Sequence, residues 1–555
     1  MTAQDPFTTL RQFPRKSPYV RNWSSTYNHS PALFFAPVSV EEVKLIFREA
    51  AAQGKKVRVV GEHASPGPIW HGEWLISTQH FKTVSIDSHS RLAILGAGVP
   101  LHAANPLLAA HNLAFPVIGS IDRVSTGAYF SGPDHGSSAA WGVCANFARR
   151  VRVVTPRGED RWVGRGEELY RAAGAGVGSC GVVVEVEWEL VEACGLEVTM
   201  ERVRLADYLK DGTGRALFDL AKSREYVKIW HFPHTLPFPL NQTDTILWRA
   251  RRVPLPPPTK PTLFATFTSF MTRIVHGLAM LVTLYLFPGL QGWVNGLLYW
   301  SKAARLPAVE VKRSYEAQSM DCLYNQLVDE WTVPFPSPSS LSSIPSPSTT
   351  SNSSLIPPHL AAPNPTITAL RSLLHYLTRT PEGKALGMHA PIEIRFNRAE
   401  KTGEGEGFYL SPGAGVVREG EREEGERQGE DDLVLWIEPI VYRPLNLPTP
   451  PRFYSFFTFF ESLLRAPSIL GRPHWCKAHF PSSRAEVERM FGAENVDAFH
   501  KARKEADPRG VMWTRWVGER VPGGSGEGEG RTVHRESERE GKRSRRYGDV
   551  MGEEA

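Results

Sequence analysis

The first third of the chain alternates between helical and strand-like patterns of apolar residues. Ser39-Val-Glu-Glu42 is a capping box, and apolar residues follow it at helical spacing up to Gly54, which predicts a helix between these points. Short apolar or alternating runs predict strands at 57–60, 74–77, 91–95 and 181–190. This mixture, with glycines at many turns, predicts an α+β fold.

One long apolar stretch, 274–301, contains no charged residue. Its length is sufficient for a membrane span. Pro288 divides it into two shorter pieces, however, and His276 and Asn295 are polar. Three interpretations stay open: a membrane-spanning helix, a helical hairpin lying on a membrane surface, and a hairpin buried in the core.

Composition narrows the class of protein. The chain has 555 residues, of which 41% are hydrophobic and 22% charged, as in ordinary globular proteins. A net charge of +5 over this length, without a basic stripe interleaved with aromatic residues, predicts no nucleic-acid partner. Five scattered cysteines without a CxxC pair favour a reducing compartment over a disulfide scaffold.

Three segments have the composition of chain outside the core. Residues 335–365 are rich in Ser, Pro and Thr, and 400–432 are rich in Gly, Glu and Arg apart from a short apolar run at 408–412. The segment 522–555 is charged and Gly-rich. We interpret them as two low-complexity insertions, linkers by default, and a disordered tail.

The N-terminal residues 1–23 lack the apolar core of a secretory signal. They are basic apart from Asp5, which suits a mitochondrial address, although Pro14 and Pro18 interrupt an amphipathic helix. We therefore expect an intracellular protein that associates with a membrane, with the mitochondrion as one alternative.

Three glycine-containing loops occur in the first part of the chain, at 61–66, 131–138 and 176–181. The last matches GxGxxG, but a helical pattern precedes it and a strand pattern follows, the reverse of a Rossmann site. We interpret it as a helix-to-strand turn. Small residues let the backbone approach a ligand, and exposed N–H groups then bind phosphate oxygens. Together the loops suggest a cofactor that carries a pyrophosphate.

With five motifs of the second half, these loops resemble the sugar-1,4-lactone oxidase family of vanillyl-alcohol-oxidase-type flavoproteins, and within it the fungal D-arabinono-1,4-lactone oxidases. Those motifs lie at 321–331, 391–395, 441–444, 472–479 and 506–510. The resemblance implies a PCMH-type FAD-binding domain of two α+β subdomains and an α+β cap that binds the substrate. The implied organisation is an extension at 1–25, the FAD-binding domain at 26–195, the cap at 196–521 and the tail at 522–555.

The resemblance also implies the residues that bind FAD. They are Gly61, His63, Ala64, Ser65, Pro66, Ser120, Gly132, His135, Gly136, Ser137, Gly181 and Val182. In the family a histidine of the first loop bonds covalently to the flavin, whereas here Ala64 takes that position and His63 precedes it. We expect non-covalent FAD; attachment through His63 and loss of FAD are the alternatives. Pro133-Asp134 also stands where the family has small residues beside the flavin.

Glu393 and Arg395 alternate with isoleucines at 392 and 394. Residues two apart on a strand share a face, so both charged groups should project together while the isoleucines pack behind them. Taken alone, the pair fits a structural ion pair. The resemblance implies that it lies over the flavin and binds the sugar.

The segment 474–479 holds a second group of candidates. His474, Cys476 and His479 are conceivable zinc ligands, but no fourth ligand is evident and we predict no metal. The resemblance places Lys477 at the substrate and the flavin. His479 is a candidate proton acceptor.

The implied reaction is FAD-dependent oxidation of an aldono-1,4-lactone at C2, with O2 as acceptor and D-erythroascorbate and H2O2 as products. The partners are therefore a sugar lactone and O2, with a membrane surface contacted through 274–301. Two alternatives stay open. One is a lactone or polyol dehydrogenase with another electron acceptor. The other is a degenerate, non-catalytic member associated with a membrane.

Overall fold

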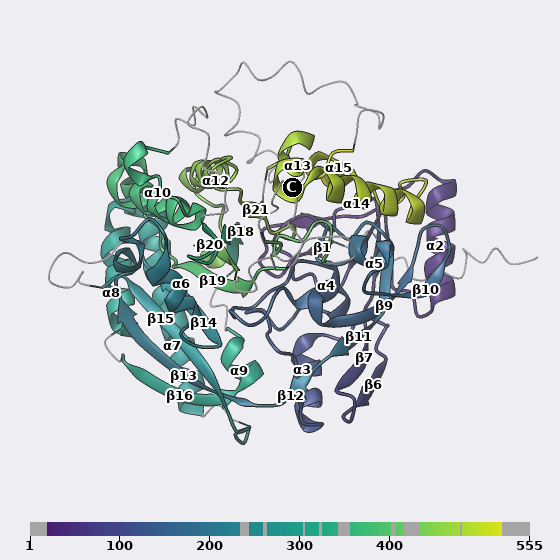
Figure 1. Cartoon of the computed structure of the whole chain (residues 1–555), viewed down its shortest axis with the longest axis horizontal. Helices are drawn as coiled ribbons and strands as arrows, with labels where there is room; N and C mark the ends of the chain where they lie inside the picture. The colour runs from purple at the N-terminus through teal and green to yellow at the C-terminus, as the bar shows by residue number, and fades with distance from the viewer. Residues whose placement is uncertain are drawn as a thin grey trace, which may run out of the picture.

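The computed structural model describes residues 19–233, 243–258, 263–303, 306–320, 325–341, 356–400, 407–415, 432–477 and 480–523. Small sheets with their helices form the N-terminal half, and one large sheet dominates the rest (Figure 1). Helices and strands alternate along the chain, which confirms the predicted α+β class.

In the N-terminal half, helix α2 (Val40–Ala52) packs against a parallel sheet of three strands. In spatial order these are β3 (Leu33–Phe35), β5 (Trp74–Ser77) and β4 (Val57–Val60). Ser39 caps the helix by accepting a hydrogen bond from the Glu42 backbone N–H at 3.2 Å. The predicted helix and the predicted strands at 57–60 and 74–77 are confirmed.

An antiparallel sheet of five strands shares the buried cluster under α2. Its order is β10 (Asp160–Gly164), β9 (Ala148–Val154), β11 (Val182–Glu189), β7 (Leu92–Gly96) and β6 (Val84–Asp87). Helix α5 (Glu168–Ala173) precedes the 176–181 loop and β11 follows it, so the predicted helix-to-strand turn is confirmed. Shorter elements are β1 (Val20–Arg21), β2 (Asn28–His29), α3 (Leu101–Ala110), β8 (Leu113–Ala114), α4 (Thr126–Ser131) and β12 (Val191–Glu192).

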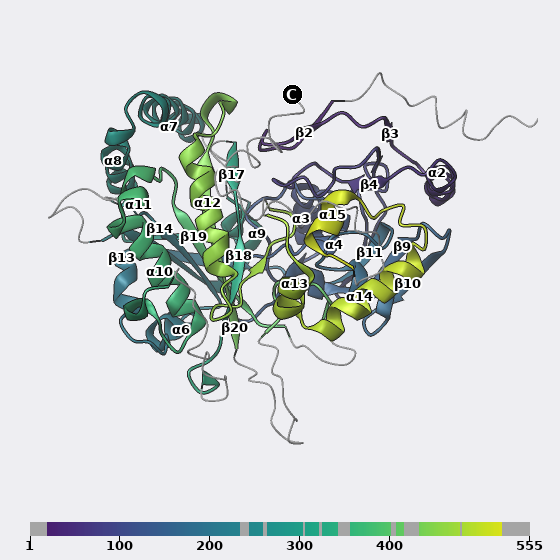
Figure 2. The ribbon, with the colours of Figure 1, turned by 90° about the horizontal axis from the view of Figure 1, so that it is seen from above.

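The large sheet has nine strands with antiparallel pairing throughout. Its order is β16 (Ala308–Arg313), β13 (Gly195–Val203), β15 (Thr245–Val253), β14 (Tyr226–His231), β19 (Ile392–Arg398), β20 (Leu433–Tyr442), β18 (Trp331–Phe335) and β21 (Arg472–Pro473), with β17 (Gln326–Val328) also on β20. Helices lie on the side away from the N-terminal half (Figure 2): α6 (Arg215–Lys222), α10 (Pro365–Arg379), α11 (Pro381–Leu386) and α12 (Pro451–Leu464). The short helix α9 (Ser314–Gln318) follows β16.

The last helices return to the N-terminal half (Figure 1). They are α13 (Arg484–Phe491), α14 (Ala493–Ala506) and α15 (Arg515–Arg520). Helix α14 packs against α5, and Val57 N–H donates to the Val511 carbonyl at 2.9 Å. The end of the segment assigned to the cap therefore packs with the FAD-binding part, although α13 also contacts β21 of the large sheet, where Arg472 Nε donates to the Met490 carbonyl at 2.5 Å.

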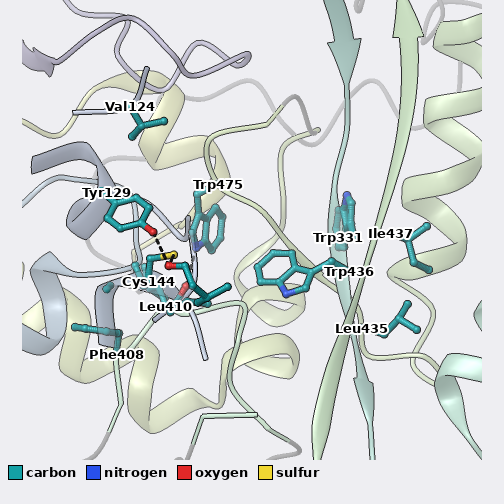
Figure 3. Close-up of a cluster of buried hydrophobic side chains, with 14 of the residues drawn as sticks. Val124, Tyr129, Cys144, Trp331, Phe408, Leu410, Leu435, Trp436, Ile437 and Trp475 are labelled. Atoms are coloured by element: carbon teal, nitrogen blue, oxygen red, sulfur yellow. Dashed lines mark hydrogen bonds between the residues drawn. The ribbon is translucent and has the colours of Figure 1, made fainter. Parts of the chain in front are cut away.

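Part of the predicted insertion 400–432 belongs to the core. Residues 407–415 are described, and Phe408 and Leu410 lie in a buried cluster that joins both halves (Figure 3). The Trp475 indole N–H donates to the Leu410 carbonyl at 2.7 Å. In the other insertion, Ser337 N–H donates to Asp432 Oδ1 at 2.8 Å. The expectation of linkers does not hold for these parts, because their apolar and hydrogen-bonding groups have partners elsewhere in the fold.

The apolar stretch forms a helical hairpin at one edge of the molecule (Figure 2). It consists of α7 (Leu263–Leu281), the turns η3 (Val282–Leu286) and η4 (Pro288–Leu290), and α8 (Gln291–Ala303). Within the described residues, no helix has the length and apolar character needed to cross a bilayer. Many large apolar side chains of the hairpin are exposed, so the interpretation of a hairpin buried in the core is wrong.

Candidate active site

A cavity of about 900 Å³ lies between the glycine loops and the large sheet. Residues directly opposite each other in an antiparallel pair point to the same face. Arg395 on β19 lies opposite Lys228 on β14, and Glu393 lies opposite Glu438 on β20. Glu393, Arg395 and Glu438 line the cavity, whereas the intervening isoleucines are buried and do not line it, as the alternation predicts.

Five charged side chains meet on this wall. Arg395 Nη2 donates to Glu330 Oε1 at 2.6 Å and to Glu438 Oε2 at 2.5 Å. Lys477, in the turn after β21, donates to Glu438 Oε1 at 2.9 Å and lies 3.6 Å from Glu330 Oε2. Glu393 Oε2 lies 3.9 Å from Arg395 Nε. The structure thus brings together three of the four predicted catalytic residues. The fourth, His479, lies outside the described residues.

Burial and neighbouring charges decide the protonation of the cluster. Burial would raise the pKa of Glu330, but Arg395, His135 and Lys477 outweigh it and hold this pKa well below its usual range. Burial and the nearby Glu330 raise the pKa of Glu438 to about 7. Burial would lower the pKa of Lys477, but Glu438 and Glu330 raise it. Glu438 can therefore exchange a proton near neutral pH.

Three buried polar atoms of the cluster have no hydrogen-bond partner among the described residues: Glu393 Oε1, Glu330 Oε2 and Arg395 Nε. Buried polar atoms are nearly always hydrogen-bonded in folded proteins. The two carboxylate oxygens can accept hydrogen bonds from hydroxyl groups, and the guanidinium N–H can donate one. These atoms suit a small polyhydroxylated ligand.

The first glycine loop follows β4 and lines the opposite part of the cavity. Asn22 Nδ2 donates to the carbonyls of Ser65 and Pro66, both at 3.1 Å, and so fixes the end of the loop. A Cβ atom at Gly61 would lie 2.1 Å from the hydroxyl oxygen of Ser125. A larger residue at position 61 would therefore require Ser125 to move, while the predicted approach of this loop to a ligand stays a prediction.

His63 and Ala64 both line the cavity. His63 has a φ of 53° and lies edge-on to Trp70 with 6.2 Å between ring centroids. Its Nδ1 is buried without a partner in the described part of the chain, and burial lowers its pKa. The imidazole is therefore neutral and faces the space where a cofactor would lie.

Gly132, His135 and Gly181 of the other two loops also line the cavity, as does Ser120, which lies outside the three loops. His135 Nε2 donates to Glu330 Oε1 at 3.1 Å, and its ring stacks on Trp436. Ser120 Oγ accepts from Arg395 Nη1 at 3.4 Å. These contacts tie the cofactor loops directly to the charged cluster.

Three predicted cofactor residues do not line the cavity. Ser137 Oγ donates to the Val227 carbonyl and accepts from Phe396 N–H, so it fastens its loop to the large sheet. A Cβ atom at Gly136 would lie 2.4 Å from the Ile118 carbonyl oxygen, and the Val182 side chain is buried in the cluster under α2. These residues support the loops, because their side-chain positions are already occupied by packing.

Asp134 brings a further carboxylate to the cavity wall. Burial raises its pKa to about 7, against the opposing effect of Lys477. No hydrogen bond of its carboxylate is found within the described residues. The Pro133-Asp134 departure therefore adds an ionisable group beside the cluster.

His135, Glu330 and His474 place three potential metal-ligand atoms within 4.8 Å of one another. Glu330 Oε1 already accepts from Arg395 and His135. His474 Nδ1 accepts from the Cys476 backbone N–H at 3.3 Å, so its proton lies on Nε2. Because Nε2 of both His135 and His474 carries a proton, neither atom is free to bind a metal. We therefore interpret the group as a carboxylate surrounded by hydrogen-bond donors rather than a metal centre.

The sequence interpretation missed Glu330 and Glu438 as site residues. Glu330 lies inside one of the motifs that carry the resemblance, but it was given no role. Glu438 is the one charged residue of a strand whose other members are apolar, Leu433–Tyr442. This single charged residue in an apolar strand could have identified Glu438 as a site candidate, because a buried charge is stable only when it has a partner.

The residues fit an elongated flavin cofactor. Glycine loops line one part of the cavity, where the Ser125 hydroxyl oxygen is buried without a described partner, and the charged cluster lines the other. Backbone N–H groups of such loops suit a pyrophosphate. The cluster then lies where a small substrate meets the cofactor.

Comparisons with known proteins agree with this geometry. A family model described as an FAD binding domain matches residues 31–164. A second, described as D-arabinono-1,4-lactone oxidase, matches residues 189–345 and 362–520, more than half of the chain. The chain is 24% identical over 544 residues to D-arabinono-1,4-lactone oxidase of Eremothecium gossypii, covering 89% of this chain and 93% of that protein. It is 27% identical over 507 residues to L-gulonolactone oxidase of Scyliorhinus torazame, covering 89% and 96%.

Solved structures support the fold. Cholesterol oxidase from B. sterolicum matches with a TM-score of 0.67 at 13% identity, over 91% of this chain and 96% of that one. Xylooligosaccharide oxidase from Myceliophthora thermophila C1, in complex with xylobiose, matches with a TM-score of 0.57 at 14% identity, over 90% and 97%. They confirm the predicted PCMH-type fold class. On the evidence of the family models, the chain is an FAD-dependent enzyme that belongs to the D-arabinono-1,4-lactone oxidase family.

Proposed function

We propose that this protein oxidises an aldono-1,4-lactone of the D-arabinono-1,4-lactone type at C2, with O2 as acceptor, and releases D-erythroascorbate and H2O2. The observation that carries the proposal is the meeting of Glu393, Arg395 and Lys477 on one wall of the cavity that the glycine loops complete. The names of the relatives support the same substrate class.

When bound, FAD supplies the hydride acceptor. Arg395 and Lys477 place two positive charges at the cluster, where they stabilise negative charge that develops on the C2 oxygen. Glu393 accepts a hydrogen bond from a sugar hydroxyl through its unpartnered Oε1. Glu438 takes the hydroxyl proton, because its pKa of about 7 lets it cycle near neutral pH.

We further propose that FAD is held without a covalent bond. Ala64 at the family's attachment position cannot form one. His63, on the same loop, lies edge-on to Trp70. Precipitation of the purified protein with acid should release flavin absorbance into the supernatant. Yellow colour retained in the pellet would assign the attachment to His63, and a His63→Ala variant would then lose it.

The reaction is tested by O2 uptake and H2O2 release with D-arabinono-1,4-lactone. Lys477→Ala should lower kcat by about a hundredfold or more, because removal of one preorganised charge has effects of that order. Its flavin content should stay near wild type, whereas its unfolding temperature should fall, because the buried carboxylates of Glu438 and Glu330 lose a cationic partner. Lys55→Ala, which removes an exposed lysine paired with Glu73, is the matched control. Unchanged turnover in Lys477→Ala would show that the active-site assignment is wrong. Flavin reduction without O2 uptake would instead indicate another electron acceptor.

A further inference from the structure

The helical hairpin has its polar and apolar sides reversed relative to a helix in water. Thr283 forms a hydrogen bond with Gln291, and Gln291 Nε2 donates to Asn295 Oδ1 at 3.0 Å. Asn295 Nδ2 in turn donates to the Met388 carbonyl. All three side chains are buried, so the polar groups of the hairpin face the body of the protein.

The outer side of the hairpin is apolar. Between 270 and 300, each exposed position whose side chain the structure describes is an apolar residue or glycine. The exposed fraction reaches 63% at Val275, 67% at Leu286 and 55% at Leu297. The surface continues onto Leu445, 78% exposed, in the turn η7 (Pro444–Asn446) that contacts α7.

This reversed arrangement indicates which surroundings, water, lipid or another protein, suit the outer face of the hairpin. A surface helix in water buries its apolar stripe and exposes its polar side. In lipid, apolar side chains can face outward and polar groups must find partners inside the protein. A protein partner would find few hydrogen-bonding groups here, whereas protein interfaces carry about one hydrogen bond per 100–200 Å². Among the exposed side chains described on this face, those of Trp293 and Trp300 carry a hydrogen-bond donor, and tryptophan favours the membrane–water interface.

We propose that the outer face of this hairpin docks into one leaflet of a lipid membrane without crossing it. Helix α8 has 13 residues, about 20 Å of helix, against about 30 Å for the hydrocarbon core. Helix α7 has 19 residues, but within the described part of the chain it lacks the apolar character of a membrane span. The first charged residues on either side of 274–301 in the sequence, Arg273 and Lys302, are both basic. Anionic headgroups therefore strengthen the contact.

The docked face lies directly behind one end of the cavity. Tyr299 of α8 packs on Phe232, with 5.1 Å between ring centroids, and His276 of α7 lies 6.4 Å from the ring of Tyr442. Phe232 and Tyr442 both line the cavity. Docking would therefore hold that end of the active-site cavity close to the lipid surface. The inference does not depend on which lactone the protein oxidises.

Cosedimentation of the whole protein with phosphatidylcholine vesicles, with and without phosphatidylserine, tests the proposal. The wild type should bind both, and more tightly with phosphatidylserine. A Val275→Glu/Leu286→Glu/Leu297→Glu variant should bind at least about tenfold more weakly, because charged groups resist transfer into lipid. The matched control is Val38→Glu/Val84→Glu/Leu107→Glu, which changes exposed apolar residues of the N-terminal half and should bind as the wild type does.

Three results would overturn the proposal. The first is a wild type that binds neither vesicle. The second is a folded hairpin variant that binds like the wild type. The third is a wild-type dimer in solution, without vesicle binding, that the hairpin variant dissociates, since a second copy would then cover the face. If the hairpin variant fails to fold, quenching of tryptophan fluorescence by brominated lipids tests the proposal instead. Brominated lipids should quench the fluorescence of the wild type, and should quench that of Trp293→Phe/Trp300→Phe less. Absence of quenching in the wild type would contradict docking.

Discussion

Glu438 is a buried carboxylate shared between Arg395 and Lys477, and this shared position sets its chemistry. Burial raises its pKa to about 7, while the two cations limit the rise. A carboxyl with an ordinary pKa would be a weak base at neutral pH, whereas one near 7 takes and releases a proton readily. Glu438 therefore has two roles: it positions Arg395 and Lys477, and it can accept and release a proton.

Replacing Glu438 by Gln should lower kcat/KM by about a hundredfold or more and flatten its pH profile. In the wild type, kcat/KM should rise as pH increases through about 7, because the raised pKa keeps the carboxyl protonated below that value. Steady-state rates with the lactone between pH 5.5 and 8.5 measure this. Glu310→Gln should keep the wild-type profile; Glu310 lies on the edge strand β16, also lines the cavity and pairs with Lys312. A sloping profile in Glu438→Gln would assign the proton transfer to another group.

At the scale of elements, Arg58 connects segments that are far apart in the sequence. It sits on β4, and its guanidinium donates to the carbonyls of Ile69 at 2.8 Å, Val177 at 2.6 Å, Gly178 at 3.0 Å and Met512 at 3.3 Å. The Arg58 side chain thus holds the third glycine loop and the segment before α15 against β4, the strand that leads into the first glycine loop.

Arg58→Met should destabilise the protein by about 4 kcal/mol or more, because four carbonyls would lose their donor and each such loss costs about 1–3 kcal/mol. Urea unfolding at neutral pH measures the change. Arg48→Met, on the exposed side of α2, should stay within about 0.5 kcal/mol of wild type. A loss in Arg58→Met no larger than in this control would mean that the carbonyls find other donors.

At the scale of the whole molecule, three buried histidines, His135, His389 and His474, have a lowered pKa. His389 Nε2 donates to the Tyr442 carbonyl at 3.1 Å, and its ring packs on Phe453. Burial lowers its pKa from 6.5 to about 3. Burial also lowers the pKa of His135 and His474 in the charged cluster. Because the unfolded chain binds these protons more readily, all three contributions are present above pH 6.5 and decrease below it.

Between pH 7.5 and 5.5, the contribution of His389 to the free energy of unfolding should therefore fall by about 1.4 kcal/mol, whereas Glu438 and Asp134, whose pKa is raised to about 7, contribute in the opposite direction. Denaturant unfolding at the two pH values measures it. His389→Asn should remove that part of the pH dependence, although its stability at pH 7.5 will be lower. His102→Asn, an exposed histidine on α3, should keep the full dependence. An equal pH dependence in wild type and His389→Asn would contradict a neutral buried imidazole.

Much of the site was accessible from the sequence at the level of single segments. The strand alternation at 392–395 correctly placed Glu393 and Arg395 on one face. The glycine loops were recognised by their small residues, and most of their predicted members line the cavity. Gly136, Ser137 and Val182 do not, because a local motif cannot show which neighbours a packed segment has already taken.

By itself, the sequence determined the local elements and the family. The capping box, the periods of apolar residues and the ordered motifs depend on neighbours a few positions apart, and helix and strand geometry converts them directly into faces. Only the tertiary structure decided that Glu330, Arg395, Glu438 and Lys477 form one cluster, since each comes from a different segment. The tertiary structure also decided which side of the hairpin faces away from the body of the protein. The residues of the hairpin are apolar nearly all round, so their order gives no direction, and only the inward hydrogen bonds of its few polar side chains set the outer face.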